Sequence, residues 1–464
     1  MDLAGALRLR LDPDAPDVVS LVGGGGKTSA MRRLAAEAVA RDKRVICTAT
    51  TRLASYEVEA TAWAVEITGA ELPLDAIAAA LDRHGQCLLI SPHVIEGEGR
   101  KYPGVSAAQV DALAVQAAKL GASALIVEAD GSRMLPAKAP AEYEPPVPSS
   151  TTLLVAVAGM DAVGRQIEED RVHRPERIRG VLGLDATEPA RLTPEMVARL
   201  LAHPHGGGKN RPPGATLVAL LNKAETAPAR ACARLAARRL AADGHMALIA
   251  SAGHMDGPPV HERWGPLAAV ILAAGEGSRL GRPKQVAEVG GEPLVVRALR
   301  RALQSDAGEI VVVTGAHAQQ TAQALAPWTA QPALGVRVVH NAAWASGQAS
   351  SMQAGLAALS PATQAALLLP VDQPFLPVSL LRRLASLWRA GWPIAAPRVD
   401  GELRGAPALF DRALWPELHA VRGDRGGRDV LRRRRYATGA VDVDGELLAD
   451  IDAPDDLAAV RGRA

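Results

Sequence analysis

Short apolar runs alternate with longer, alanine-rich helical patterns along most of the chain, and this alternation limits the possible folds more than any other feature. A helix that connects two strands returns the chain to the same edge of the sheet, so strands separated by helices pair in parallel. Apolar residues make up 48% of the sequence but aromatic residues only 3%, so alanine, valine and leucine must fill the cores. The pattern therefore predicts an α/β protein with doubly wound, mainly parallel sheets.

The alternation is interrupted by the stretch "AGHMDGPPVHERWGP" (residues 252–266), which holds three prolines and three glycines. Clusters of proline and glycine without periodicity are typical of loops and linkers. We therefore expect two domains, residues 1–257 and 267–464, joined by a linker over residues 258–266. The two halves share this general pattern but no motif, so they are not an internal repeat.

Charge and cysteine content exclude several classes of protein. The chain has 52 basic and 50 acidic residues, a balance that does not suit a polyanion-binding surface, and its arginine run at 432–435 is best explained as a solvated helix face. The three cysteines form no CxxC pair, so they predict neither a metal framework nor an oxidising compartment. Apolar runs are far shorter than the ~20 residues of a membrane helix, and the acidic N-terminus is unlike a secretory signal. We expect a soluble, cytoplasmic protein that binds neither nucleic acid nor membranes.

The most informative segment is "LAAVILAAGEGSRLGRPKQVAEVGGEPL", residues 267–294. An apolar strand pattern leads directly into a loop of glycines and cations. Glycines allow backbone N–H groups to surround phosphate oxygens, and nearby cations neutralise those oxygens. Arg279 and Lys284 are the candidate catalytic cations. The candidate nucleotide-binding residues in this loop are Leu272, Ala273, Ala274, Gly275, Gly277, Ser278 and Gly281.

Aspartates follow two later apolar runs. "LLLPVDQPFL" places Asp372 just past a strand, and "LLADIDAPDDL" places Asp450 and Asp452 after another apolar stretch. Ligands of an open α/β sheet bind beyond the carboxyl ends of its strands. Any one of these aspartates alone could equally cap a following helix. Together with the glycine loop, they lead us to expect that Asp372, also a catalytic residue, and Asp452 hold Mg²⁺ beside a triphosphate.

From Leu267 onward the chain resembles the MobA-like nucleotidyltransferases, and within them the molybdenum cofactor cytidylyltransferase (MocA-like) branch. The resemblance is carried by "LAAGEGSRLGRPKQ", "VVHNAAWASGQASSMQAGL", "PVDQPFL", "GAPALFDRALWPEL", "GDRGGRDVL" and "DIDAPDDL". It implies a Rossmann-like domain that transfers a nucleotidyl group from an NTP to the phosphate of molybdopterin cofactor and releases pyrophosphate. The site residues that it implies are Lys284 and Arg279 for the phosphates, Asp372 and Asp452 for the metal, and Gly347 and Gln348 for the nucleotide or the pterin.

Two positions in this half bear on the substrates. Guanylyl-transferring relatives tend to read LAGG, whereas this chain has Ala274 at the first of these two glycines, so CTP is favoured over GTP. Family members often carry a longer side chain where this chain has Ala406.

Because the acceptor is itself a phosphate, positioning and charge neutralisation suffice without a protein nucleophile. We therefore expect His317 and His340 to be structural or surface residues.

The first half has its own glycine loop, "VVSLVGGGGKTSAMRRLAAEAV" (residues 18–39). Strand, glycines, Lys-Thr and helix is the order of a phosphate-binding loop, although the usual eight-residue motif has a glycine where this chain has Leu21. Two companions follow other strands: "VEADGS", whose Asp130 we expect to bind a metal ion, and "LLNKAE", which resembles the NKxD element with Glu225 in place of aspartate. The candidate nucleotide-binding residues of this half are Gly24, Gly25, Gly26, Lys27, Thr28, Asn222 and Lys223.

Up to about Gly257 the chain resembles the selenium-dependent hydroxylase accessory proteins (YqeC-like). The resemblance is carried by "VGGGGKTS", "TATTRL", "VEADGSRMLPAKAPAEYEPPVP", "GMDAVGRQIEEDRVHRPE" and "LLNKAE", with Tyr143 where the family often has histidine. It implies a P-loop-like, NTP-binding accessory domain that acts in the maturation of molybdenum hydroxylases. The loop "HPHGGGKN" (residues 203–210) has two histidines and no nearby cysteine, so a flexible basic loop is favoured over a metal site.

The two resemblances together favour a bifunctional maturation protein. In this hypothesis an NTP-binding accessory module is fused to a Mg²⁺-dependent nucleotidyltransferase that serves a molybdenum hydroxylase apoenzyme. Two alternatives stay open: transfer to another phosphorylated acceptor, such as a sugar phosphate, and a non-catalytic carrier or chaperone that binds NTP and cofactor.

Overall fold

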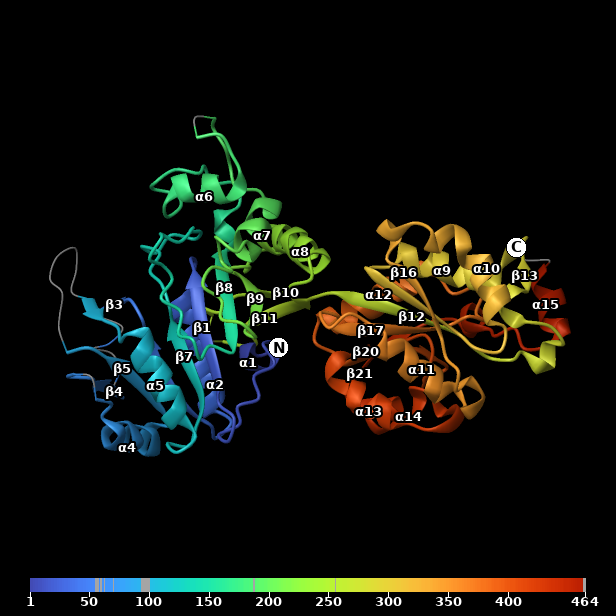
Figure 1. Ribbon diagram of the computed structural model, residues 1–464, viewed down its shortest axis with the longest axis horizontal. Coiled ribbons are helices and arrows are strands. Elements are labelled where there is room, and N and C mark those ends of the chain that lie inside the picture. The colour runs from blue at the N-terminus through green and yellow to red at the C-terminus, as the bar shows by residue number, and fades with distance from the viewer. Residues whose placement is uncertain are drawn as a thin grey trace. The chain divides into compact units, whose positions relative to one another are not determined.

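The computed structural model describes residues 1–54, 58, 61, 63–69, 71–92, 101–186, 188–254 and 256–461. The chain forms two compact units, Met1–Trp264 and Gly265–Ala464 (Figure 1). Each unit is built around one large sheet covered by helices. This arrangement confirms the predicted α/β architecture.

The N-terminal unit contains a nine-stranded sheet in the order β11-β10-β9-β8-β1-β7-β2-β5-β4. Every neighbouring pair is parallel except β10 and β11. The strands are β1 (Asp17–Gly23), β2 (Arg44–Ala49), β4 (Ala64–Glu66), β5 (Gln86–Ile90), β7 (Ala122–Glu128), β8 (Leu153–Gly159), β9 (Thr216–Asn222), β10 (Met246–Ala250) and β11 (Val260–Trp264), and a separate pair consists of β3 (Arg52–Ala54) and β6 (Lys101–Pro103). The helices are α1 (Leu3–Ala6), α2 (Lys27–Val39), α4 (Leu74–His84), α5 (Ala107–Ala117), α6 (Pro175–Leu182), α7 (Pro194–Ala202) and α8 (Ala227–Ala242).

The central strands of this sheet are apolar on both faces because helices cover both faces. All residues of β1, β7 and β8 are buried. On one face Val19 belongs to the same core as Leu34 of α2, whereas its neighbour Val18 faces the opposite side, in a core with Leu113 of α5. Continuous apolar runs are the expected pattern for parallel strands buried in this way.

Strand β11 lies inside the segment 258–266 that we expected to link two domains. It pairs antiparallel with β10 at the edge of the first sheet, with Trp264 opposite Ala247. The backbone N–H of Val260 donates to the carbonyl oxygen of Met1 over 3.1 Å. The division between the two units consequently falls after Trp264. Six of the fifteen residues in 252–266 are proline or glycine, and β11 has apolar residues only at its two ends, so the sequence showed no strand pattern there.

The C-terminal unit has an eight-stranded sheet in the order β16-β15-β12-β17-β20-β18-β19, and β21 also pairs with β18. Its core strands are parallel, but β20 runs antiparallel to both β17 and β18, so this sheet is mixed. The strands are β12 (Leu267–Ala273), β15 (Glu309–Thr314), β16 (Val336–His340), β17 (Ala365–Pro370), β18 (Ile394–Val399), β19 (Glu402–Leu403), β20 (Ala408–Asp411) and β21 (Thr438–Asp442), and a small hairpin consists of β13 (Glu288–Val289) and β14 (Glu292–Pro293).

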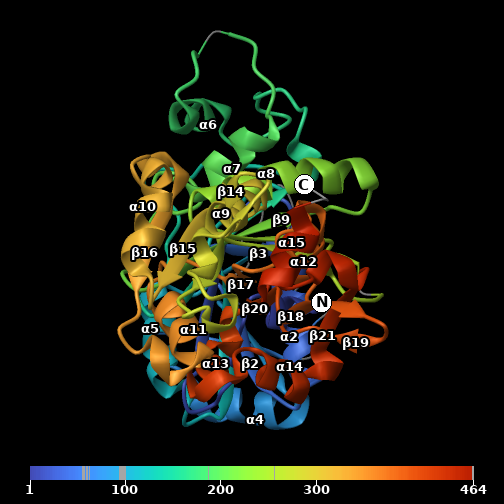
Figure 2. The same ribbon diagram turned by 90° about the vertical axis from the view of Figure 1, so that its right-hand side faces the viewer.

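Helices cover both faces of this second sheet, as Figure 2 shows. Leu299 of α9 and Trp388 of α12 belong to one core, and Met352 of α11 and Leu418 of α13 belong to the core on the other face. The helices are α9 (Leu294–Gln304), α10 (Ala318–Thr329), α11 (Gln348–Ala357), α12 (Val378–Arg389), α13 (Trp415–Ala420), α14 (Arg428–Arg433) and α15 (Pro454–Arg461). Within the described part of the chain, every helix is too short or too polar to cross a bilayer.

Candidate active site

A loop of unusual backbone shape follows β12 in the C-terminal unit. Gly277 and Gly281 both adopt positive φ angles, +68° and +69°, a region that side chains other than glycine rarely occupy. A Cβ atom at Gly277 would lie 3.1 Å from the carbonyl oxygen of Arg282 and 3.1 Å from the backbone nitrogen of Lys284. The chain therefore returns close to Gly277 before it reaches Lys284, and glycine is what permits that approach.

The buried side chain of Gln285 holds this loop through hydrogen bonds to its backbone. Its Nε2 atom donates to the carbonyl oxygens of Ala273, at 3.0 Å, and of Gly275, at 2.6 Å. Gln285 is 1% exposed, so these are internal bonds that define the path of the loop. The sequence analysis did not identify Gln285, although its place directly after Lys284 was a signal.

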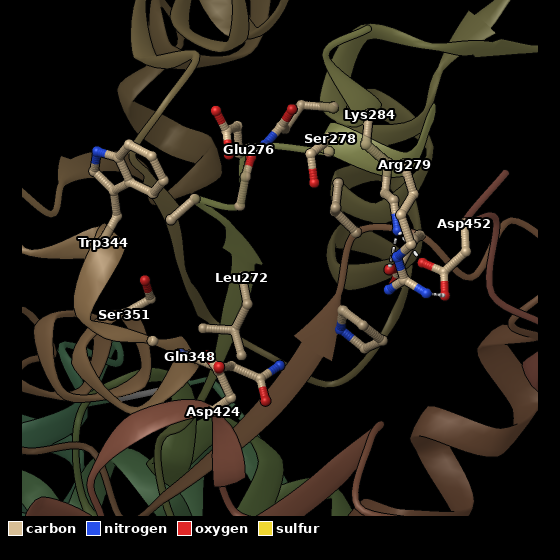
Figure 3. Close-up of a pocket in the computed structure, with 18 of the residues that line it drawn as sticks. Leu272, Glu276, Ser278, Arg279, Lys284, Trp344, Gln348, Ser351, Asp424 and Asp452 are labelled. Carbon is tan, nitrogen blue, oxygen red and sulfur yellow. Dashed lines mark hydrogen bonds and ion pairs between the residues drawn. The ribbon is translucent and has the colours of Figure 1, made fainter. Parts of the chain in front are cut away.

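Lys284 lies between two carboxylates. Its Nζ atom is 2.9 Å from Oδ2 of Asp372 and 2.7 Å from Oδ1 of Asp452. A guanidinium nitrogen of Arg279 lies 3.1 Å from the other oxygen of Asp452 (Figure 3). Four residues that the sequence predicted as catalytic or metal-binding therefore meet at one point, although 168 positions separate Lys284 from Asp452.

These contacts shift the pKa values of the groups involved. Burial by itself would lower the pKa of Lys284, but the charge of Asp372 and the hydrogen bond to Asp452 outweigh it, and the pKa is raised. The hydrogen bond from Lys284 lowers the pKa of Asp452, with a contribution from the charges of Lys284 and Arg279. Burial and the neighbouring charge of Asp372 raise the pKa of Asp450. Lys284 is thus a cation and Asp452 an anion throughout the neutral range.

Backbone contacts position the aspartates at the carboxyl edge of the sheet. Asp372 follows β17, and its carbonyl oxygen accepts from the backbone N–H of Ile451 over 3.0 Å, which joins the two acidic segments. The carboxylate of Asp456 accepts from the backbone N–H groups of Asp452, at 2.9 Å, and Ala453, at 2.8 Å. Asp456 lies in the first turn of α15, so its carboxylate ties the start of that helix to the backbone that carries Asp452.

The site offers Mg²⁺ few protein ligands, as is usual in enzymes that act on nucleotides. Among the residues that the structure describes, no three His, Cys, Asp or Glu side chains form a ready-made metal site. Mg²⁺ is commonly held by one or two carboxylates together with substrate phosphates, and Asp372 and Asp452 provide such carboxylates. Metal binding by these two aspartates stays a prediction.

A cavity of about 590 Å³ extends from this cluster. Its other end is lined by Leu272, Trp344, Gln348, Ser351 and Asp424, as Figure 3 shows. Clefts of 300–1,000 Å³ are typical of small-molecule sites, so the cavity has room for a nucleotide.

Gly347 shapes the far end of this cavity. It has a φ angle of +111°, and a Cβ atom there would lie 2.5 Å from the carbonyl carbon of Gly423. The close approach lets the backbone N–H of Gln348 donate to Asp424 over 3.2 Å. Gly347 and Gln348 were predicted site residues, and both line the cavity together with Trp344, Ser351 and Asp424. Ser351 belongs to the segment "ASGQASS" that we expected near the nucleotide or the pterin, whereas Trp344, just before that segment, and Asp424, within "GDRGG", were not predicted.

The remaining predicted residues of this half occupy supporting positions. Ala274, Gly275, Gly277 and Ser278 line the cavity, while Ala273 is 1% exposed and contributes only its carbonyl oxygen to Gln285. The ring Nε2 of His317 lies 2.8 Å from the carbonyl oxygen of Glu276 and so braces the glycine loop.

In the N-terminal unit, the glycine loop after β1 is closed by internal hydrogen bonds. The backbone N–H of Gly23 donates to both carboxylate oxygens of Asp130, over 3.1 and 3.0 Å. Gly24 donates to the carbonyl oxygen of Val157 over 2.9 Å, and Gly25 donates to that of Leu135 over 3.1 Å. The amides of Gly24 and Gly25, which the sequence suggested for phosphate binding, are therefore occupied in this conformation.

Lys27 is also turned inward, and it is 3% exposed. Its Nζ donates to the carbonyl oxygen of Gly23 over 2.6 Å and lies 3.2 Å from the carboxylate of Asp130. Asp130 is paired a second time, with Lys138 at 3.2 Å, and Lys138 contacts Glu144 at 2.7 Å. The carboxylate of Asp130 thus bridges two buried lysines. Lys27 and Lys138 already neutralise the negative charge that would attract a metal ion.

Glu128 is the carboxylate beside the hydroxyl group of this loop. Thr28 Oγ1 donates to Glu128 Oε2 over 2.8 Å. Glu128 is the last residue of β7 and lies opposite Leu21 of β1, so its side chain reaches the start of α2. Metal binding by Asp130 stays a prediction, and the carboxylate in contact with the hydroxyl group of Thr28 is that of Glu128.

Asn222 lies against the same loop, whereas the side chain of Lys223 contacts Asp161. Asn222 Nδ2 donates to the carbonyl oxygen of Gly25 over 2.9 Å, and its Oδ1 accepts from the backbone N–H of Ala252 over 2.9 Å. Asn222 therefore supports the loop from within, since it is 2% exposed. Lys223 has a φ angle of +57° and lies 3.3 Å from Asp161.

The predicted basic loop at residues 203–210 is tied down. Lys209 Nζ donates to the carbonyl oxygens of Ala141, at 2.5 Å, and Glu142, at 2.9 Å. Asn210 Nδ2 donates to that of Pro145 over 2.8 Å. The loop therefore supports the segment that contains Glu144.

Comparison with known proteins agrees with this division into two units. The family described as YqeC protein matches residues 19–176, and the MobA-like NTP transferase domain matches residues 269–438. The uncharacterized protein YqeC of Escherichia coli K12 is 33% identical over 210 residues, which cover 45% of this chain and 76% of that protein. The chain belongs to the YqeC and MobA-like NTP transferase families.

The region similar to the MobA-like unit spans most of the length of two relatives. Nicotine blue oxidoreductase of Paenarthrobacter nicotinovorans is 36% identical over 203 residues, which cover 41% of this chain and 94% of that protein. Molybdenum cofactor guanylyltransferase of Rhizobium meliloti is 33% identical over 193 residues, which cover 40% of this chain and 82% of that protein. The MobA-like unit is therefore a nucleotidyltransferase, and both resemblances drawn from the sequence are confirmed.

Proposed function

We propose that the MobA-like unit transfers CMP from CTP to the terminal phosphate of molybdopterin cofactor and releases pyrophosphate. The observation that carries this proposal is the position of Lys284 between Asp372 and Asp452 at one end of a nucleotide-sized cavity. The names of relatives add support, since one is a molybdenum cofactor guanylyltransferase.

The reaction needs no protein nucleophile. An oxygen of the acceptor phosphate forms a bond to the α-phosphorus of the NTP, while the bond from that phosphorus to the bridging oxygen breaks and pyrophosphate leaves with the electron pair. Lys284 has three N–H donors and uses two on the aspartates, so one can be donated to a phosphate oxygen. Arg279 is 76% exposed in its side chain and can move onto the triphosphate. Mg²⁺ held by Asp372 and Asp452 would supply further charge neutralisation.

Ala274 supports CTP as the donor. It stands where guanylyl-transferring relatives tend to have glycine, and it lines the cavity with a side chain that is 4% exposed and belongs to the core on that face of the sheet. GTP is the competing donor because the Rhizobium relative carries the name of a guanylyltransferase.

For the YqeC unit we propose NTP binding that supports hydroxylase maturation. The contact between Thr28 and Glu128 is the one expected between the hydroxyl and acidic ligands of a P-loop magnesium site. Phosphate binding by the loop amides would require Asp130 and the segment with Leu135 to withdraw from Gly23 and Gly25.

A transfer assay with purified full-length protein tests the proposal. Each of the four NTPs is incubated with molybdopterin cofactor or with sugar phosphates, and pyrophosphate and the dinucleotide product are measured. We expect product with CTP and molybdopterin cofactor. Pyrophosphate release with a sugar phosphate alone would assign the sugar phosphate as acceptor. Binding of NTP and cofactor without any product would instead assign a carrier role.

A further inference from the structure

A second cavity of the MobA-like unit, of about 340 Å³, shares no lining residue with the catalytic one. Three arginines of α9 line it, namely Arg297, Arg300 and Arg301, and Glu292 and Phe375 form part of its wall. The spacing i, i+3, i+4 places the three guanidinium groups on one face of the helix. We call this feature the arginine cavity.

Positive charge exceeds negative charge in the arginine cavity. Among its lining residues, Glu292 is the only carboxylate beside three guanidinium groups. Glu292 lies 3.0 Å from Arg300 and 3.6 Å from Arg297. The 3.6 Å contact is made by the buried Nε atom of Arg297, which makes no hydrogen bond within the described residues. Burial and the charge of Arg297 lower the pKa of Arg301 to about 10. Three guanidinium groups thus share one carboxylate, and Arg301 directs its hydrogen bonds to backbone carbonyl oxygens, so the lining keeps a net positive charge.

The same arginines hold the two segments that follow the catalytic residues. Arg297 donates to the carbonyl oxygen of Val289 over 2.8 Å, in the hairpin that comes after Lys284. Arg301 donates to the carbonyl oxygens of Pro374 and Leu376, in the loop that begins after Asp372. A ligand in the arginine cavity would therefore contact arginines that also hold the backbone after Lys284 and after Asp372.

We propose that the arginine cavity binds a phosphate-class oxyanion and that its occupancy rigidifies these two segments. The planar guanidinium fork matches phosphate oxygens better than it matches chloride, and several such forks in one cavity favour a doubly charged anion. Inorganic phosphate, pyrophosphate and phosphomonoesters share this chemistry. The proposal is independent of which base and which acceptor the catalytic cavity uses.

Equilibrium dialysis of the full-length protein with radiolabelled orthophosphate tests binding. It is performed at constant ionic strength, with and without saturating CTP, and competition with unlabelled pyrophosphate and glucose 6-phosphate distinguishes the possible sources. We expect one phosphate per chain that CTP does not displace. Complete displacement by CTP would place the phosphate in the catalytic cavity and overturn the proposal.

Three variants locate the site. Arg300→Gln removes the cation that pairs with Glu292 and leaves the backbone hydrogen bonds of Arg297 and Arg301 in place. We expect phosphate affinity to fall about tenfold. Glu292→Gln removes the competing carboxylate, and we expect the affinity to rise severalfold. Arg383→Gln, on the exposed face of α12 and outside the cavity, is the matched control and should bind as the wild type does. Wild-type affinity in both cavity variants would overturn the proposal, and Glu292→Gln alone decides if Arg300→Gln does not fold.

Hydrogen exchange tests the second part of the proposal. Phosphate should slow amide exchange in residues 287–293 and 373–377 of the wild type, and the effect should be lost in Arg300→Gln at the same phosphate concentration. Phosphate binding without protection of these segments would show that the cavity does not act on the catalytic residues.

Discussion

The ammonium group of Lys284 lies 2.9 Å from the carboxylate of Asp372, although 88 residues separate them in the chain. The lysine follows the glycine loop after β12, and the aspartate follows β17, the strand that pairs in parallel with β12. Parallel pairing brings the carboxyl ends of both strands to the same edge of the sheet, which is where α/β proteins bind ligands.

Asp372→Asn should abolish nucleotidyl transfer while the fold is retained. The substitution keeps the shape of the side chain but removes the charge that faces Lys284 and that is proposed to bind metal. Loss of one electrostatic contact of this kind typically costs about 10²–10³ in rate. Asp400→Asn is a suitable control, since Asp400 is exposed and its φ angle of +50° suits asparagine. Wild-type turnover in Asp372→Asn would show that this residue has no part in the reaction.

Gly277→Ala and Gly281→Ala form a matched pair in the catalytic loop. Their φ angles differ by only one degree, +68° against +69°, so alanine should strain the backbone equally, by about 1 kcal/mol. Only at Gly277 would the new methyl group press on Arg282 and Lys284, because no heavy atom lies within 4 Å of such a group at Gly281. We expect kcat/KM to fall at least tenfold more in Gly277→Ala. Equal losses in both variants would mean that backbone strain alone explains the need for glycine.

Asp130→Ala should destabilise the YqeC unit strongly. The change leaves Lys27 and Lys138 buried beside one another without the carboxylate that both contact. Breaking a buried ion pair in this way typically costs about 3–5 kcal/mol, which chemical denaturation can measure. Asp161→Ala, which removes a half-exposed partner of Arg165 and Lys223, should cost less than about 1 kcal/mol. A small effect of Asp130→Ala would mean that the lysines find other partners, and the inward position of Lys27 would need another explanation.

His173 should make the stability of the YqeC unit fall in mild acid. Burial and the charges of Arg174 and Lys138 lower its pKa from 6.5 to about 4, so the folded chain keeps it neutral. The unfolded chain binds a proton below about pH 6.5, while the folded chain does not do so until about pH 4, and stability is lost across that interval. In thermal unfolding between pH 7 and 5, His173→Gln should lose less stability than the wild type. His340→Gln, at an exposed strand end, is the control and should follow the wild type.

Much of both sites could be predicted because the signals are local. A strand pattern followed by glycines and a cation identifies a loop at the end of a parallel strand, and an aspartate after an apolar run lies at the same edge. On this basis Lys284, Arg279, Asp372 and Asp452 were correctly expected to lie near one another. Residue type and spacing are sufficient to predict site residues that lie directly after the strands of a parallel sheet.

The sequence by itself determined the two α/β units, their glycine loops and the acidic residues that accompany them, because apolar periodicity and glycine spacing depend on residues close together in the chain. Tertiary structure alone decided which partner each charged group has. Two residues separate Glu128 from Asp130, yet the strand end directs Glu128 to Thr28 while the turn directs Asp130 to Lys27 and Lys138. The side chain of Gln285 beneath the loop and the arginine cavity likewise depend on contacts between distant segments. The direction of a buried side chain and the distance to its partner follow from how the sheets and helices pack, and no local pattern specifies them.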